Sequence, residues 1–166
     1  MVTDPRFQLT TRDHAILQAM LEQHSGPYDA WVTLLERKVR ESTLYFRDDI
    51  PPGVVTLGTK LTYLVDGVVI GPHVVVQDAD GDISGALSLR SLRGLALLGL
   101  AERAALRIET GAGGAETVQV HEVLSQPEAE ARAAARPVQN VVSFRPRRPG
   151  PAVGFDPDDD PGPSAA

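Results

Sequence analysis

Three aspartates at alternate positions are the first residues whose types and spacing suggest chemistry. Asp78, Asp80 and Asp82 have the 1, 3, 5 spacing of an EF-hand calcium loop. That loop also needs a glycine at its sixth position and a bidentate carboxylate at its twelfth, where this chain has Ile83 and Leu89. The segment therefore predicts a β-turn rich in aspartate rather than a calcium site.

Glycines and histidines also occur in patterns that can be compared with known sites. The Gly111–Gly114 run leads into an alternating pattern at Glu116–Val123, whereas a phosphate-binding loop leads into a helix. A zinc site needs three or four converging ligands, but the chain has no cysteine and its histidines are widely separated: His14, His24, His73 and His121. No serine or histidine lies in a nucleophile motif. We therefore expect no catalytic residue, no metal ion and no cofactor.

The composition is that of a small protein with one moderate core. Of the 166 residues, 42% are hydrophobic, and the formal net charge is −6. Because an acidic chain gains no general attraction to phosphate backbones, we expect no tight direct binding to nucleic acid. The apolar runs are shorter than the roughly 18 residues of a membrane span, and the first residues lack an apolar signal segment. We therefore expect a cytoplasmic protein without membrane contact.

Residues 10–46 are predicted to form two helices. Thr10 or Thr11 can cap the first helix, Ser25–Pro27 interrupts the pattern, and the second helix begins near Asp29. Apolar residues recur at helical spacing: Ile16, Leu17, Met20 and Leu21, then Trp31, Leu34, Leu35 and Val39. The short connection predicts an antiparallel helical hairpin with arms about 20 Å long, whose apolar stripe packs on itself.

The segment from residue 54 to residue 124 carries patterns typical of strands. Asp66–Gly67 indicates a two-residue hairpin turn, and Pro72 favours an edge strand or a bulge. A short leucine-rich stretch around Leu95 predicts one short helix. Strands are expected at 54–65, 68–77, 83–89, 106–109 and 117–123. The fold class is therefore α+β, with a helical hairpin followed by about four or five antiparallel strands and one short helix.

Composition also predicts the domain boundaries. A linker at 48–53 contains two prolines, so that residues 1–48 form the helical hairpin and residues 49–130 form the β-rich domain. Residues 131–166 form a tail that becomes rich in proline and aspartate and has too few apolar residues to fold, and we expect it to be disordered.

Residues 88–124 are predicted to form a strand, a short helix and a hairpin with a glycine-rich turn. This order of elements resembles the C-terminal domain of bacterial Gre-type transcript cleavage factors. The Rnk-type regulators are similar in layout. The resemblance covers about residues 8–126 and implies an FKBP-like fold for the β-rich domain. It also implies that RNA polymerase is the partner, with the C-terminal domain on the rim of the secondary channel and the helical hairpin entering that channel. In the cleavage factors, acidic residues at the hairpin tip help to hold Mg²⁺.

The chain departs from the cleavage pattern at the hairpin and at the docking turn. Its hairpin is short, and Glu22 and Asp29 are the only carboxylates at the tip. The family carries an Asp-Ser-Pro-like turn before the short helix, and the matching residues here are Arg90, Ser91 and Leu92. A short hairpin without the acidic cluster is closer to the Rnk-type layout.

These features lead to a ranked set of hypotheses. The first is a non-enzymatic regulator of elongation that binds RNA polymerase through Arg90, Ser91 and Leu92, and that meets DNA only through the polymerase. The second is a Gre-like cleavage factor that uses Glu22 or Asp29. The third is an interaction module with a different partner. A prolyl isomerase or another enzyme with a small-molecule substrate is not expected, because Tyr63 is the only aromatic residue between 49 and 130.

Overall fold

The computed structural model describes residues 4–79 and 84–136. The helices and strands in chain order are β1 (Gln8–Thr10), α1 (Thr11–Gln23), α2 (Ala30–Glu41), β2 (Thr43–Tyr45), β3 (Lys60–Val65), β4 (Val68–Val76), β5 (Ala86–Ser88), α3 (Leu92–Leu97), β6 (Ala105–Thr110), β7 (Gly114–Ser125) and α4 (Pro127–Ala135). Residues 131–135, which were predicted to begin the disordered tail, instead belong to α4, where the alanines favour a helix. The predicted disorder of the tail beyond residue 136, and Asp80 and Asp82 of the predicted turn, lie outside the described residues.

Two hairpins form most of a five-stranded sheet with the order β5-β4-β3-β7-β6. The turn between β3 and β4 is Asp66–Gly67, with φ of 48° and 86°. Both values suit the tight turn that the sequence predicts. The β6–β7 hairpin has its glycine-rich turn before Gly114 and pairs Leu106 with Val118. Both predicted hairpins are confirmed, and the α+β class is confirmed with them.

The sheet differs from the prediction at its β5 edge. β5 pairs with β4 in parallel, Val74 opposite Ala86, so the sheet is mixed rather than wholly antiparallel. Apolar and polar alternation predicts strands but carries no information on their direction, which explains the error. The predicted irregularity at Pro72 is confirmed, because the β3–β4 register shifts between Leu61 and Tyr63, opposite this residue.

Local signals explain where the helices begin. The Thr10 side chain accepts a hydrogen bond from Asp13 N and caps α1, and the Asp29 side chain accepts one from Val32 N and caps α2. The pair β1–β2, which is parallel and joins the two ends of the helical segment, was not predicted. Strands of three residues are too short to produce a recognisable alternation.

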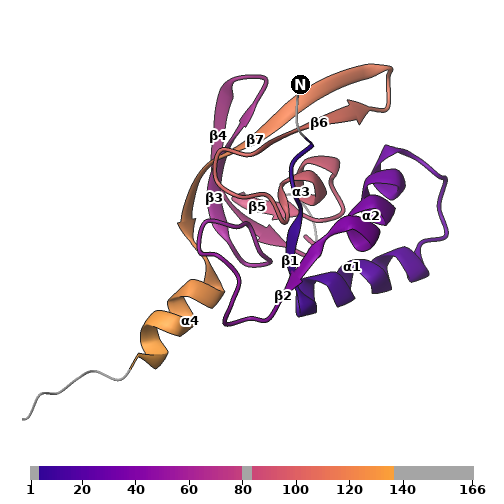
Figure 1. Ribbon diagram of the computed structural model, residues 1–166. Coiled ribbons are helices and arrows are strands. Elements are labelled where there is room, and N and C mark those ends of the chain that lie inside the picture. The colour runs from indigo at the N-terminus through magenta and orange to yellow at the C-terminus, as the bar shows by residue number, and fades with distance from the viewer. Residues whose placement is uncertain (1–3, 80–83, 137–166) are drawn as a thin grey trace, which may run out of the picture. The chain divides into compact units, whose positions relative to one another are not determined.

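The α1–α2 pair lies on one side of the core and the sheet on the other, and α3 fills part of the space that separates these two layers (Figure 1). Buried side chains from every layer form one cluster: Leu17 and Met20 of α1, Leu34 and Leu35 of α2, Leu95 and Leu97 of α3, and Leu61, Tyr63, Val118 and Val120 of the sheet. The prediction that the apolar stripe of the hairpin packs on itself is therefore wrong. Each helix turns its stripe toward the shared core, because a sheet with one apolar face also needs a cover.

The described residues up to Arg136 belong to one compact unit. The boundaries 1–48, 49–130 and 131–166 stay a prediction, and so does the finer likeness to FKBP-like domains. Among the described segments, no helix combines the length and the apolar character that crossing a bilayer requires.

Candidate partner-binding surface

The three residues that the sequence selects for partner binding lie at the start of α3: Arg90 and Ser91 in the turn before it and Leu92 as its first residue. The Ser91 side chain accepts a hydrogen bond from Gly94 N at 3.0 Å and donates one to Ser88 O at 2.7 Å. Ser91 is thus the N-cap of α3. A Cβ atom at Gly94 would lie 2.0 Å from Ser88 O, so the helix packs on the turn more closely than any other residue allows. The backbone of the turn is therefore fixed before any partner arrives.

Arg90 lies on this turn and already has an acidic partner within the chain. Its Nε donates to Asp78 Oδ1 at 2.6 Å, and both side chains are about half exposed. An exposed pair of this kind contributes little to stability. It does orient the guanidinium group and leaves its remaining N–H groups available to an external carboxylate.

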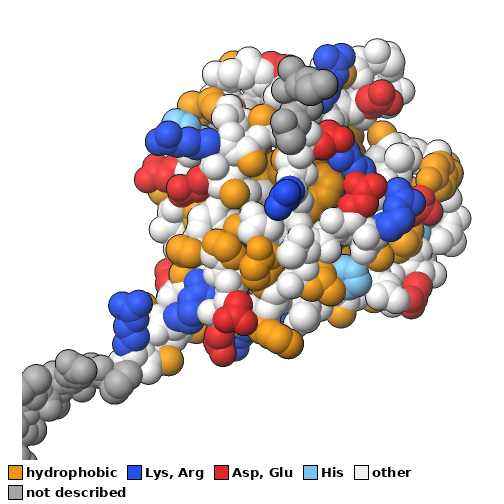
Figure 2. Space-filling model, in the orientation of Figure 1, with side chains coloured by type: hydrophobic (Ala, Val, Ile, Leu, Met, Phe, Trp, Pro, Cys, Tyr) orange, Lys and Arg blue, Asp and Glu red, His pale blue; other side chains and the backbone are white. Residues whose placement is uncertain are grey.

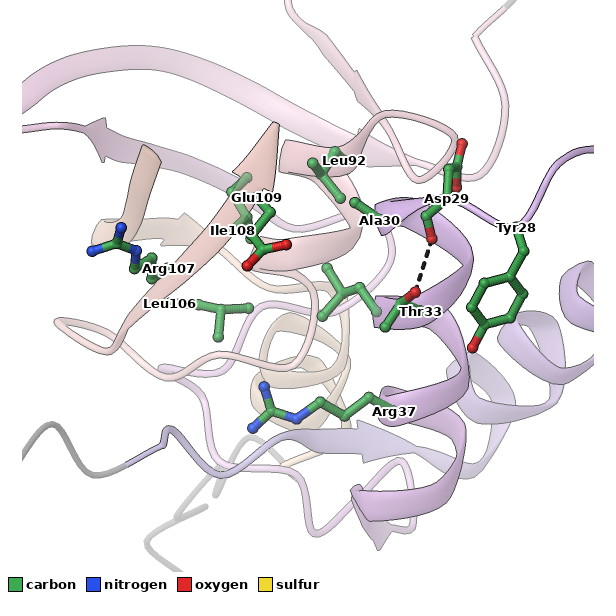
Figure 3. A pocket seen from close by; sticks show the side chains of 11 residues that line it. Tyr28, Asp29, Ala30, Thr33, Arg37, Leu92, Leu106, Arg107, Ile108 and Glu109 are labelled. Carbon is green, nitrogen blue, oxygen red and sulfur yellow. Dashed lines mark hydrogen bonds between the residues drawn. The ribbon is translucent and has the colours of Figure 1, made fainter. Parts of the chain in front are cut away.

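Leu92 contributes to a cleft that we call the α2–β6 cleft. It has a volume of about 460 Å³. Its lining comes from Tyr28 and Asp29, from α2 between Ala30 and Arg37, from Leu92, and from β6 between Leu106 and Glu109. Figure 3 shows Leu92 and Leu106 on one side of this space and α2 on the other. Figure 2 shows hydrophobic side chains at the base of a hollow between the β6–β7 hairpin and the α1–α2 pair, with charged groups around it.

The two carboxylates predicted at the hairpin tip have other partners. The side chain of Asp29 caps α2, and its backbone oxygen accepts a hydrogen bond from Thr33 Oγ1 at 2.9 Å (Figure 3). Glu22 accepts a hydrogen bond from Gln18 Nε2 at 3.1 Å, one turn earlier in α1. Within residues 4–79 and 84–136, no group of three or more His, Cys, Asp or Glu side chains is arranged to hold a metal ion.

The hairpin tip is fastened to the β-rich part of the chain. Trp31 Nε1 donates to Leu89 O at 2.9 Å, and the Trp31 ring lies 5.6 Å from the His24 ring across the tip. Trp31 is only half-buried, and its hydrogen bond reaches Leu89, the residue immediately before Arg90. The tip and the candidate docking turn are therefore held together.

The sequence analysis missed Lys38, the largest buried polar side chain. Its Nζ donates to Ala96 O at 2.9 Å and also to Leu98 O, and lies 4.4 Å from the centre of the Phe7 ring. These carbonyls lie at the C-terminal end of α3, where a cation is favourable. Burial lowers the pKa of the Lys38 amine well below its usual range. The sequence did contain a signal for this burial, because Lys38 follows Leu35 by three residues and therefore lies on the apolar stripe of α2.

Asp13 is a second buried charge with a structural task. Its Oδ2 accepts a hydrogen bond from Leu57 N at 3.1 Å, which links α1 to the segment before β3. Burial raises the pKa of the Asp13 carboxyl. Neither the burial of Asp13 nor its contact with Leu57 was predicted from the sequence.

Comparison with known proteins gives a structural likeness and no sequence match. No protein-family model and no curated protein sequence matches the chain. A prokaryotic transcription elongation factor GreA/GreB from Nitrosomonas europaea is 27% identical with a TM-score of 0.55, over 72% of this chain and 98% of that one. The Gfh1 proteins of Thermus thermophilus and Thermus aquaticus are 19% and 18% identical, with TM-scores of 0.35 and 0.37. The T. thermophilus match spans 71% of this chain, the T. aquaticus match 72%, and each covers 98% of the Gfh1 protein. The Nitrosomonas match confirms the resemblance to the Gre-type family.

Proposed function

We propose that this chain binds RNA polymerase near the secondary channel and regulates elongation without cleaving RNA. The premise is that it shares the order of elements and the fold of the Gre-type transcription elongation factors. The docking surface is the turn at Arg90, Ser91 and Leu92. The proposal of a regulator without enzymatic activity rests mainly on one observation, the way in which the helical hairpin is built into the core.

A cleavage factor needs a hairpin that reaches away from its docking domain. Here α1 and α2 have 13 and 12 residues, about 20 Å each at 1.5 Å per residue. Their apolar faces pack into the same core as the sheet. Trp31 fastens the tip to Leu89. This arrangement supports a function in which the hairpin positions or stiffens the docking surface.

The chemistry of the tip supports the same proposal. Mg²⁺ is bound by one or two free carboxylates together with substrate phosphates and water. Asp29 uses its carboxylate to cap α2, and Glu22 lies on the other helix next to Gln18. Because Asp29 Oδ1 already accepts from Val32 N, a shared metal ion would compete with the cap for this carboxylate, and loss of the cap costs about 1 kcal/mol.

A cleavage assay on stalled elongation complexes tests the absence of catalysis. We expect no Mg²⁺-dependent shortening of the transcript at saturating protein. Cleavage that disappears in Glu22→Gln or Asp29→Asn would reject this proposal and support the second hypothesis, a cleavage factor that uses these carboxylates. Asp29→Asn is a fair variant, because asparagine also caps helices well.

Binding to purified core polymerase tests the docking surface. We expect Arg90→Asp to weaken binding, and the difference from the wild type to shrink as salt rises. Asp78→Asn is the matched control, because it removes the partner of Arg90 and leaves the guanidinium in place. Equal loss in both variants would mean that the ion pair matters only for the shape of the turn.

The third hypothesis, an interaction module with another partner, predicts a different result. It requires that the wild-type protein is not retained on core polymerase at any salt concentration. The same binding experiment therefore distinguishes the first two hypotheses, which require binding to polymerase, from the third, which requires another partner.

A further inference from the structure

The strand β6 is an edge of the five-stranded sheet, and its backbone groups can be assigned from its neighbours. Thr117 O accepts a hydrogen bond from Asp66 N at 3.0 Å, and Thr117 N donates to Asp66 Oδ1 at 2.8 Å. Both polar groups of Thr117 therefore point away from β6. Because Arg107 is the residue paired with Thr117, the N–H and C=O groups of Arg107 point away from β7, toward the free edge.

The alternation of the antiparallel ladder extends this assignment. Val120 N donates to Ala104 O at 3.1 Å. This bond just before β6 places the even-numbered residues of β6 in the hydrogen-bonded pairs. The backbone groups of Ala105, Arg107 and Glu109 then form the free edge. Across residues 4–79 and 84–136, no hydrogen bond from outside the β6–β7 pair reaches these three residues. Such a row of donors and acceptors is a template for a further strand.

The α2–β6 cleft gives this edge an apolar floor. Leu106 and Ile108 turn inward and are almost fully buried, and Leu34 and Leu92 lie beside them in the lining. A second hollow of about 390 Å³ shares Ala30, Arg107 and Glu109 with the first and continues to the β6–β7 turn. The strand is therefore bordered by open space from Leu106 to the β6–β7 turn.

The side chains on the outer face of β6 carry opposite charges. Arg107 and Glu109 are both exposed, and Figure 3 shows the Arg107 side chain pointing away from α2. In the part of the chain that the structure describes, neither residue takes part in an ion pair. A strand added to this edge would place a residue directly opposite each of them, where opposite charges stabilise and like charges destabilise the pair.

We propose that the free edge of β6 binds an extended peptide segment of a partner protein by antiparallel strand addition. The segment carries a basic, an apolar and an acidic residue in succession. The basic residue lies opposite Glu109 and the acidic residue opposite Arg107. The apolar residue lies opposite Ile108 and enters the α2–β6 cleft. This inference does not depend on the proposed binding to polymerase.

The sequence of β6 itself supplies a probe with the required pattern. A capped synthetic peptide Ala-Leu-Arg-Ile-Glu-Thr, identical to residues 105–110, places its arginine opposite Glu109 and its glutamate opposite Arg107 when it runs antiparallel. Several antiparallel pairings can use the free backbone groups of β6, because a free peptide can turn either of its own edges toward the strand. Of these pairings, the register that aligns Arg107 with Glu109 matches both charges.

Nuclear magnetic resonance of the full chain with added peptide tests the proposal. We expect the amide signals of Ala105, Arg107 and Glu109 to shift, and the exchange of these amides with solvent to slow. The amides of Leu106 and Ile108, already bonded to β7, should exchange as before. Slowed exchange confined to other elements, or no change at β6, would overturn the proposal.

A charge exchange provides the matched control. The peptide Ala-Leu-Glu-Ile-Arg-Thr, with its two charges interchanged, should bind about tenfold more weakly, since both pairs become repulsive. The double variant Arg107→Glu with Glu109→Arg should prefer this second peptide. Equal binding of both peptides by both proteins would reject the proposed register. Sedimentation of the protein alone should show a monomer; a dimer lost in Arg107→Glu would assign the edge to a second copy and reject a partner peptide.

Discussion

Lys38 places an amine inside the core, where it closes the C-terminal end of α3. Its two carbonyl partners and the Phe7 ring come from two separate segments of the chain. The side chain thus connects α2, α3 and the residues before β1. A hydrophobic residue of similar length would fill the space but would leave the carbonyls of Ala96 and Leu98 without these donors.

The lowered pKa of Lys38 makes stability depend on pH in a definite direction. In the unfolded chain a lysine holds its proton up to about pH 10.5. In the folded chain the proton is lost at lower pH, so between these two values the unfolded state binds more protons. The contribution of Lys38 to stability therefore increases as pH rises through this window. It is fully present above the unfolded pKa and is lost as pH falls through the folded pKa.

We predict that the wild type gains stability relative to Lys38→Met as pH rises toward 10.5. The free energy of unfolding of the wild type minus that of the variant therefore increases with pH. The slope approaches at most about 1.4 kcal/mol per pH unit for one proton. Urea unfolding of both proteins at a series of pH values measures it. Lys60→Met, at an exposed lysine, is the control and should give a nearly constant difference. Parallel curves for wild type and Lys38→Met would show that the pKa of Lys38 is the same in both states.

At the scale of elements, the contact between α3 and the turn before it sets the shape of the proposed docking surface. Gly94 allows this contact because it has no Cβ atom, which would lie only 2.0 Å from Ser88 O. We predict that Gly94→Ala lowers the free energy of unfolding by more than 2 kcal/mol, on the order expected for overpacking in a fixed core. Gly111→Ala is the control, because an added Cβ there meets no atom within 4 Å. Thermal or urea unfolding compares the two, and equal losses would contradict the packing argument.

The connection between the helical pair and the sheet also depends on Trp31. We predict that Trp31→Phe, which removes the donor to Leu89 O, costs about 1 kcal/mol. Trp31→Ala should cost about 3 kcal/mol through lost packing. Urea unfolding followed by circular dichroism measures both. A negligible effect of Trp31→Ala would mean that the hairpin tip is not held by this side chain.

Elements with a strong local signal could be predicted from the sequence. The Asp66–Gly67 turn and the caps at Thr10 and Asp29 depend on neighbouring residues, and each was found as expected. The parallel pairing of β5 and the burial of Lys38 depend on contacts with distant segments. A single sequence shows neither. The residues of the docking turn were selected through the family resemblance, whereas the free edge of β6 became visible only from its neighbours in the sheet.

At the scale of the whole molecule, the shared core decides whether the helical hairpin is a separate domain. The side chains of α1 and α2 contribute to the same buried cluster as the sheet. Asp13, Trp31 and Lys38 each donate to or accept from residues beyond position 48. A hairpin removed from these contacts would expose its apolar stripe, and helices of 13 and 12 residues are marginal in water by themselves.

We therefore predict that the hairpin and the β-rich segment unfold together in one cooperative transition. Trp31 fluorescence reports on the hairpin, whereas the backbone amides of β3 and β7 report on the centre of the sheet. Both signals should give the same midpoint and the same denaturant slope in urea, as two-state unfolding requires. A fluorescence transition at clearly lower urea would instead show that residues 1–48 unfold as a domain of their own. Unfolding of Trp31→Phe followed by amide signals alone controls for any effect of the reporter, and its single transition should shift as a whole because the lost hydrogen bond stabilises the entire core.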